Sequence, residues 1–396
     1  MARRIPSPPP ELKEPELETW TLQLKTITPM FGGSATPRKV DDNNPIRAAS
    51  VRGHLRFWWR ATAGAQYPTA EALFKAEEEI WGSAKQHGLV RLKITLTNPG
   101  NKKSHSDFVN GFGDARGYAL FPFAENRREN TPAACCLQDI AFSLELTCPA
   151  AFRFEVEAAV GAWVMFGGIG ARTRRGCGSL ELISQISTTT KTQRLHQNLL
   201  TLAPAAYLIG DKLSDPVAAW KKAVELYKEF RQGKKFARDE GSDHSKPNKL
   251  GRSRYPEPDS IRRISPNAKW RHQAKHPVQG FPRADLGLPI VFHFINEGTD
   301  HTLESTSEFG TRFASPVITK AIKVDGGYVP AILLLDAPHV WEAGDLKFEK
   351  QDKKIARAQV ELTLQQRQQV SPLKGLPIRE ALLEFAKSKG FKEVRL

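Results

Sequence analysis

The alternation of apolar and polar residues predicts a mixed α and β domain in the first half of the chain. Alternation typical of strands occurs over residues 20–26, 89–96, 118–123, 142–146 and 179–183. Apolar residues recur at helical spacing over residues 48–63, 69–81 and 154–166. Without the short strand over 118–123, this order matches the βαββαβ arrangement of a ferredoxin-like domain, an antiparallel sheet with helices on one face and the other face open for a ligand.

The second half shows a weaker pattern of the same kind. Strands are predicted over residues 288–294, 316–324 and 328–335, and helices over residues 215–230 and 378–385. Residues 228–283 are basic and rich in Pro, Gly and Ser, which predicts a long mobile segment with little regular structure.

We therefore expect an α+β fold of two ferredoxin-like (RRM-like) domains with long loop insertions. A loose lead-in over residues 1–18 precedes domains at 19–190 and 191–396, and the second carries the basic insertion at about 231–283.

The charge balance favours a polyanionic partner. The chain has 396 residues, with 58 Lys and Arg against 43 Asp and Glu, a formal net charge of +15. Nucleic acid and an anionic membrane both fit such a field, and a merely soluble basic protein is the plain alternative. No transmembrane run or secretory signal is apparent, so nucleic acid is the favoured partner and a membrane is not expected. The four cysteines form no CxxC pair, which fits a reduced cytoplasm.

Three arginines form a stripe on the first predicted helix. Arg52, Arg56 and Arg60 are spaced i, i+4 and i+8, beside an apolar arc that should bury Trp58 and Trp59. Since no carboxylate lies at i±3 or i±4, the arginines lack partners on their own helix and are suited to phosphate. Ion pairs with acids from elsewhere are the alternative.

A second cluster follows the helix over residues 154–166. Glycines at positions 167, 168, 170, 176 and 178 surround Arg172, Arg174 and Arg175. Free backbone N–H groups and guanidiniums together form a cradle for anions, and Gly168 and Gly170 allow close approach of a ligand. The segment lacks the Gly-Lys-Ser/Thr of a Walker loop and the G-x-G-x-x-G dinucleotide fingerprint, so no nucleotide cofactor is expected.

Catalytic chemistry has little support in the sequence. His272 and His276 are i, i+4 but have no acid at ligand spacing, and Asp41 and Asp42 are more simply a solvated loop pair. No nucleophile elbow or HExxH is present. We predict no catalytic residues, no metal and no cofactor.

Two motifs resemble a known family. Residues 28–33 (TPMFGG) and 45–60 (PIRAASVRGHLRFWWR) resemble the opening of the first RAMP subunits of Cmr complexes, the type III-B CRISPR effectors. Residues 167–178 (GGIGARTRRGCG) are similar to the glycine-rich loop of RAMP proteins, with Cys177 where an aromatic or aliphatic residue is usual. Residues 313–316 (FASP) are a weaker match to the family's second half.

The resemblance implies an RNA-binding subunit that does not cut RNA. It implies guide (CRISPR) RNA near its 3′ end and target single-stranded RNA as ligands, other Cmr RAMP subunits as partners, and a role in antiviral defence. Carried onto this sequence, the expected RNA contacts are Arg47, Arg52, Arg56, Arg60, Gly168, Gly170, Arg172, Arg174 and Arg175.

Two other functions stay open. One is a metal-independent endoribonuclease that processes CRISPR repeat RNA, with a histidine such as His54 brought near the glycine-rich loop as general acid and base. The other is a scaffold whose basic segment over residues 228–283 binds anionic partners non-specifically.

Overall fold

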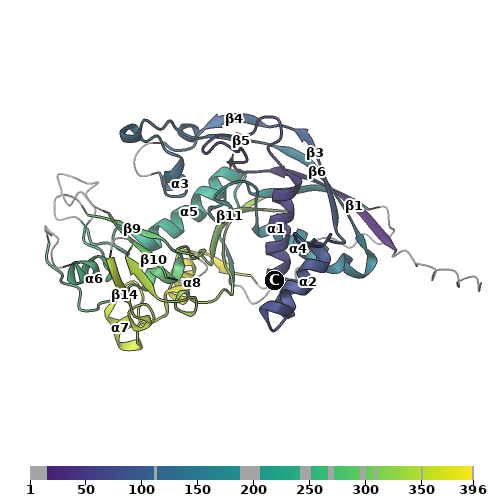
Figure 1. Ribbon diagram of the computed structural model, residues 1–396. Coiled ribbons are helices and arrows are strands. Elements are labelled where there is room, and N and C mark those ends of the chain that lie inside the picture. Colours follow the sequence, from purple (N-terminus) through teal and green to yellow (C-terminus); the bar gives the residue numbers. More distant parts are fainter. Residues whose placement is uncertain are drawn as a thin grey trace, which may run out of the picture.

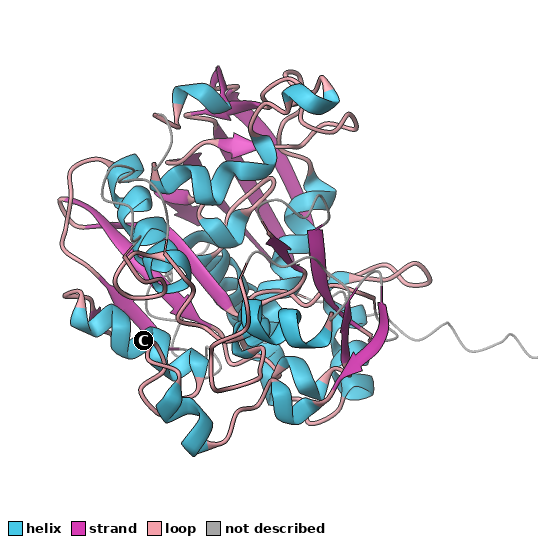
Figure 2. Cartoon of the chain, turned by 90° about the vertical axis from the view of Figure 1, so that its left-hand side faces the viewer, coloured by secondary structure: helices cyan, strands magenta, loops and turns pink. Residues whose placement is uncertain are grey.

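The computed structural model describes most of the chain. It covers residues 16–110, 114–187, 206–240, 251–265, 272–294, 300–306, 310–348 and 351–394. Figure 1 shows α1 and α4 side by side next to β1, β3 and β6, with α5 and β11 in the middle of the molecule. Figure 2 shows helices and strands in every part of the molecule, as expected of a mixed α and β fold.

The first half forms the predicted ferredoxin-like sheet. Its strands are β1 (Leu17–Thr26), β3 (Arg91–Asn98), β6 (Ala141–Pro149) and β7 (Leu180–Ser187). Neighbours pair antiparallel in the order β3-β6-β1-β7. Helix α1 (Ala48–Ala61) connects β1 to β3, and α4 (Arg153–Phe166) connects β6 to β7. This is the 2-3-1-4 strand order of a βαββαβ unit.

One face of this sheet forms the core with the two helices. Trp20, Leu22 and Leu24 alternate along β1 and are buried. The intervening Thr21 and Gln23 belong to the other face, which β1 lines with polar side chains rather than with aromatic rings. The sheet therefore offers no row of aromatic side chains along β1 on which bases could stack.

A second sheet repeats the topology. Its strands are β8 (Ala206–Ile209), β11 (Val317–Val324), β12 (Gly327–Leu334) and β15 (Lys392–Glu393), in the antiparallel order β11-β12-β8-β15. Helices α5 (Pro216–Gln232) and α8 (Ile378–Ser388) connect its strands. The predicted fold class is confirmed. The predicted division at 190/191 falls outside the described residues and stays a prediction.

Smaller elements complete the chain. One sheet holds β2 (Met30–Phe31), β5 (Cys135–Gln138) and β4 (Asn101–Ser104), and another holds β14 (Gln351–Ile355), β13 (Leu346–Phe348), β10 (Asp300–Ser305) and β9 (Ile290–His293). The remaining α-helices of the described residues are α2 (Ala70–Trp81), α3 (Ala115–Leu120), α6 (Glu257–Ile264) and α7 (Leu364–Gln369).

Two local predictions differ from the structure. The predicted strand over 118–123 is wrong: it is the end of α3 and a 3₁₀ turn, because Ala119 and Leu120 are buried together by the tertiary packing. The lead-in predicted for residues 1–18 ends earlier, since β1 begins at Leu17, and residues 1–15 lie outside the described part.

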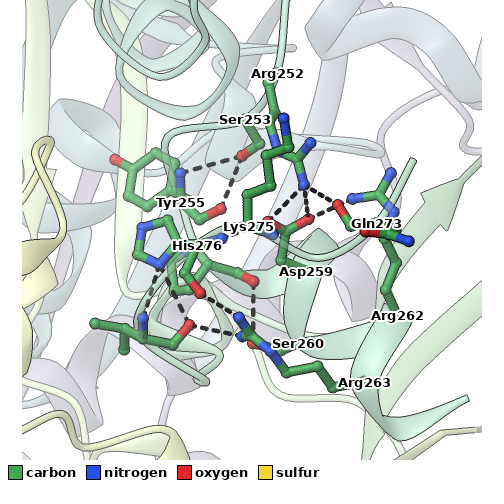
Figure 3. A network of polar contacts seen from close by, with 12 residues as sticks. Arg252, Ser253, Tyr255, Asp259, Ser260, Arg262, Arg263, Gln273, Lys275 and His276 are labelled. Atoms are coloured by element: carbon green, nitrogen blue, oxygen red, sulfur yellow. Dashed lines mark hydrogen bonds and ion pairs between the residues drawn. The ribbon is translucent and has the colours of Figure 1, made fainter.

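The basic insertion is more ordered than predicted. Within its described residues, α6 buries Ile261, and Phe281 lies in the same cluster. The carboxylate of Asp259, almost fully buried, accepts two hydrogen bonds of 2.8 Å from Arg252 and one from the N–H of His276 at 2.7 Å (Figure 3). The prediction of little regular structure is therefore wrong here, because a buried carboxylate and apolar anchors fix a segment whose average composition is polar. Residues 241–250 and 266–271 lie outside the described residues.

Candidate nucleic-acid interface

The glycine-rich loop, residues 167–178, lies between the two ferredoxin-like halves. Lys320 on β11 donates from Nζ to the carbonyl of Gly167 at 2.7 Å, and Trp220 on α5 donates from Nε1 to the carbonyl of Arg175 at 2.6 Å. Both donors come from the second half of the chain. The loop's backbone is therefore held by the second half as well as by its own domain, and it cannot change shape without disturbing both.

Close chain approaches account for the two predicted glycines. A Cβ at Gly168 would lie 2.8 Å from the carbonyl oxygen of Gly178. Gly170 has φ +86°, and a Cβ there would lie 2.5 Å from the carbonyl oxygen of Phe31. Both contacts are too short for any side chain, so packing inside the protein already requires glycine at these positions. Their contact with RNA stays a prediction.

Arg172 is the most unusual residue of the loop. It takes a left-handed conformation, φ 58°, that is strained for a residue with a side chain. Its guanidinium lies 5.6 Å from the ring centre of Phe121, and its buried Nε has no hydrogen-bond partner. Burial and the neighbouring charge of Arg175 both lower its pKa. Arg172 is thus a strained, desolvated cation without a counterion, the situation that a bound anion would relieve.

Arg174 and Arg175 connect the loop to the other domain through backbone carbonyls. Arg174 donates to the carbonyl of Ser315, and Arg175 donates to that of Val317 at 2.7 Å. Among the described residues, no carboxylate lies within ion-pair distance of either guanidinium or of Arg172. Three positive charges therefore gather within four residues and remain uncompensated, as an anion site requires.

The arginine stripe of α1 has a partner that the sequence did not reveal. Glu77, buried on α2, contacts Arg56 Nε at 2.5 Å and Arg60 Nη1 at 2.6 Å. As expected, neither arginine has a carboxylate partner on α1 itself, but Glu77 reaches both from the neighbouring helix. The alternative of ion pairs from elsewhere is the one the structure contains. Contact of Arg56 and Arg60 with RNA stays a prediction.

The other two predicted arginines differ in exposure. Arg52 donates to the carbonyls of Trp81 and Val90 at 3.0 and 3.1 Å, which anchors the end of α2 to α1. Arg47 is exposed, precedes α1, and donates to the carbonyl of Gly33 at 2.7 Å. Arg47 is therefore the more available of the two for an outside anion.

A small cavity brings α1 and the loop together. It has a volume of about 180 Å³ and lies between α1, the loop and β11. His54 and Phe57 line it from α1, and Arg174 lines it from the loop, with the guanidinium 5.2 Å from the ring centre of Phe57. The two clusters that the sequence singled out thus meet at one place in the fold.

The described residues offer little for metal or thiol chemistry. Among them, no three His, Cys, Asp or Glu side chains gather where they could hold a metal ion. All four cysteines are free, and burial raises the pKa of Cys177 to about 12, so its thiol stays protonated and inert. Over the same residues, no helix has the length and apolar character to span a bilayer.

Comparison with known proteins places these features in a family. Residues 23–181, which contain α1 and the loop, match the model of the RAMP superfamily. Over 177 residues the chain is 30% identical to CRISPR system Cmr subunit Cmr1-2 of Pyrococcus furiosus, covering 40% of this chain and 92% of that one. This chain belongs to the Cmr1 family of RAMP proteins.

Two further Cmr1 proteins are similar to this chain at lower sequence identity. Subunit Cmr1-1 of Pyrococcus furiosus is 26% identical over 141 residues, which cover 35% of this chain and 40% of that one. A crystal structure of Cmr1 from Pyrococcus furiosus in its apo form aligns over 91% of this chain and 97% of its own, with 18% identity and a TM-score of 0.47.

Sequence reasoning missed three residues that shape this Cmr1-family site: Glu77, Trp220 and Lys320. Lys320 carried a signal, since it is the one charged residue within the apolar strand pattern 317–322. Glu77 and Trp220 carried none, because each acts on an element far away in sequence. Their roles follow from how helices and sheets pack, which periodicity alone does not specify.

Proposed function

We propose that this chain is a non-catalytic RNA-binding subunit of a type III-B CRISPR Cmr complex. It binds guide RNA near the 3′ end, target RNA, or both, and it assembles with other Cmr RAMP subunits. Its role is in antiviral defence. The relatives it matches are named as Cmr subunits of a CRISPR system, which supports the assembly. The observation that carries the RNA contact is the uncompensated group of Arg172, Arg174 and Arg175.

The physical argument for RNA phosphate rests on unpaired charge. A guanidinium that has a carboxylate partner must give it up, or share it, to bind a phosphate. Arg56 and Arg60 have such a partner in Glu77, whereas the loop arginines have none among the described residues. The net charge of +15 adds a long-range attraction for the strand. We therefore assign the loop, with exposed Arg47 beside α1, the larger share of phosphate binding, and Arg56 and Arg60 a smaller one. Arg52 has no carboxylate partner among the described residues and donates to two backbone carbonyls, so it remains a proposed contact.

The test compares charge removal at two places. Fluorescence anisotropy would measure the Kd of single-stranded RNA and of duplex DNA of equal length. The loop variant carries Arg172→Gln, Arg174→Gln and Arg175→Gln, since glutamine keeps a donor for the carbonyl contacts. The control carries Lys75→Gln, Arg357→Gln and Lys387→Gln, three cations that each pair with an acid. Both variants lose three charges.

The proposal predicts preference for RNA, weakened at least tenfold in the loop variant and within about twofold of wild type in the control. Equal loss in both variants would mean that only total charge matters, and it would contradict the proposal. Circular dichroism before each titration shows that the variants are folded.

A second function has one observation in its favour. His54 lines the cavity beside the loop, and burial lowers the pKa of its imidazole, which leaves a neutral base next to Arg174. This is the arrangement that the metal-independent endoribonuclease alternative needs. Gel analysis of each RNA sample after the titration separates the two functions: cleaved RNA that stays intact with His54→Phe would favour the enzyme.

Contacts inside the basic insertion count against the scaffold alternative. Arg252 and Arg254 pair with Asp259 and Asp239 at 2.8 and 2.7 Å, so part of the segment's charge is already used inside the protein. A variant with Lys275→Gln and Lys235→Gln tests it. We expect RNA binding within about twofold of wild type, and a loss as large as that of the loop variant would move the binding site to the insertion.

A further inference from the structure

The cavity between α1 and the glycine-rich loop has an apolar frame. Phe57 on α1, Phe166 at the end of α4 and Ile318 on β11 line it. Its volume of about 180 Å³ equals that of roughly six water molecules at liquid density. That is less than the roughly 300 Å³ at which sites for whole small ligands begin. The cavity therefore suits a fragment of a larger ligand, such as one flat ring system.

Three polar side chains line the same cavity and have no hydrogen-bond partner in the described part of the chain. They are the imidazole of His54, the indole Nε1 of Trp58 and the hydroxyl of Thr173. By contrast, the neighbouring Trp59 donates from Nε1 to Glu155 at 2.9 Å, and Trp163 donates to the carbonyl of Gly168 at 2.9 Å. None of the three polar atoms of this set is fully closed off from solvent, so a ligand that enters the cavity could reach each of them and form a hydrogen bond.

Gly167 keeps the indole edge of Trp58 open. A Cβ at position 167 would lie 2.6 Å from Trp58 Nε1 and would cover that nitrogen. Gly167 therefore has two roles. It ends helix α4, and its lack of a side chain leaves the indole nitrogen of Trp58 accessible from the cavity.

The unmet groups form a mixed set of donors and acceptors. Indole N–H donates, the hydroxyl of Thr173 donates and accepts, and an imidazole kept neutral by burial offers one donor and one acceptor. Arg174, with its guanidinium beside Phe57, adds a cation to the lining. The apolar walls and the mixed donors and acceptors suit the face and the edge of a nucleobase, and the guanidinium of Arg174 suits the phosphate joined to it.

We propose that this cavity receives one unstacked nucleobase of the bound RNA. The base lies between Phe57 and Ile318, and its edge bonds to Trp58, His54 and Thr173. The adjoining phosphate lies against Arg174. This inference rests on the proposed function and adds to it: the loop would bind the sugar-phosphate backbone of the RNA, and the cavity would prefer some bases over others.

The experiment uses the full chain and five polymers of equal length. Four are single-stranded homopolymers of A, C, G and U, and the fifth is a ribose-phosphate strand without bases. Two variants remove one donor each: Thr173→Val keeps the shape of the side chain, and Trp58→Phe also shortens the ring system. The controls are Trp59→Phe, which removes an indole donor already bonded inside the protein, and Thr95→Val on the exposed side of β3.

The inference predicts that at least one homopolymer binds more tightly than the baseless strand and that the four homopolymers differ in Kd. Trp58→Phe and Thr173→Val should each weaken the favoured homopolymer about two- to tenfold, as expected for one hydrogen bond, and leave the baseless strand unchanged. The controls should retain the wild-type preference.

The opposing outcomes are distinct. Homopolymers that bind no better than the baseless strand would overturn the base pocket and leave the backbone grip intact. A preference for bases that both variants retain would place base recognition elsewhere and also overturn it. If no strand binds at all, the proposed function fails and the pocket fails with it.

Discussion

The chemistry of this chain depends on a few residues whose local situation is unfavourable for folding. Arg172 is the clearest case: a side-chain-bearing residue at positive φ with a buried nitrogen that lacks a partner. Such strain persists where the surrounding structure enforces it, and it concentrates at functional sites. We expect stability and RNA binding to oppose each other at this position.

Replacing Arg172 by glycine tests that opposition. Arg172→Gly removes the side chain that is strained at positive φ and the desolvated charge, so we expect the free energy of unfolding to rise by about 1 kcal/mol. RNA affinity should fall severalfold, because one phosphate contact is lost. Denaturant unfolding and anisotropy measure the two quantities. A less stable variant with unchanged affinity would make Arg172 a structural residue.

Lys320 gives a prediction on pH. Burial lowers the pKa of this ammonium to about 7, against 10.5 for the ordinary side chain. Between pH 7 and 10.5 the unfolded chain therefore binds more protons than the folded one, and the contribution of Lys320 to stability rises with pH. Below pH 7 the folded protein carries a buried charge whose one hydrogen-bond partner among the described residues is the carbonyl of Gly167.

The variant Lys320→Met isolates this contribution. The variant should exceed the wild type in unfolding free energy most below pH 7. This excess should shrink as the pH rises toward 10. Urea unfolding at pH 6 and pH 9 measures it. A difference that does not change with pH would show that the lysine titrates normally in the folded protein.

At the scale of elements, the sequence predicted best what is local. Helix α2 begins after Thr69, whose side chain accepts from the N–H of Ala72, and both the cap and the apolar spacing are readable in sequence. The ion pairs of α1 with Glu77 were not predictable, because they depend on the angle at which two helices pack. The order in the basic insertion was missed for a similar reason: Asp259 organises residues far apart in sequence.

The pairing between α1 and α2 leads to a prediction about Glu77. Glu77→Gln leaves Arg56 and Arg60 without a counterion, so we expect a loss of about 2 kcal/mol of unfolding free energy. RNA affinity should stay the same or rise slightly, since two cations become free. Urea unfolding with anisotropy on the same samples measures both. Affinity that falls while the protein stays folded would contradict the structural role.

Helix α6 is expected to depend on Asp259 in the same way. Burial alone would raise the pKa of this carboxyl, but hydrogen bonds from Arg252, His276 N–H and Lys275 N–H outweigh it and lower the pKa to about 2. Its stabilising effect is present above pH 4 and is lost as the pH falls through 2. Asp259→Asn should raise hydrogen exchange in α6 at pH 7 and leave α4 unchanged. Equal exchange in wild type and variant would contradict this.

At the scale of the whole molecule, two domains of the same topology hold one charged loop between them. Lys320 and Trp220 reach the loop from the second domain, and Arg174 and Arg175 return contacts to it. The proposed binding surface therefore belongs to neither half of the chain alone. The fold class followed from the order of strands and helices, whereas this arrangement required the contacts between the halves.

The central claim is that the loop arginines bind RNA phosphate, and its most direct test is the dependence of RNA affinity on salt. For single strands, the logarithm of affinity falls with the logarithm of salt concentration by about 0.7 per phosphate contact. The variant Arg172→Gln/Arg174→Gln/Arg175→Gln should therefore flatten the slope by about 2 relative to wild type. The control Lys75→Gln/Arg357→Gln/Lys387→Gln should keep the wild-type slope. An unchanged slope in the loop variant, with the protein folded, would contradict the account.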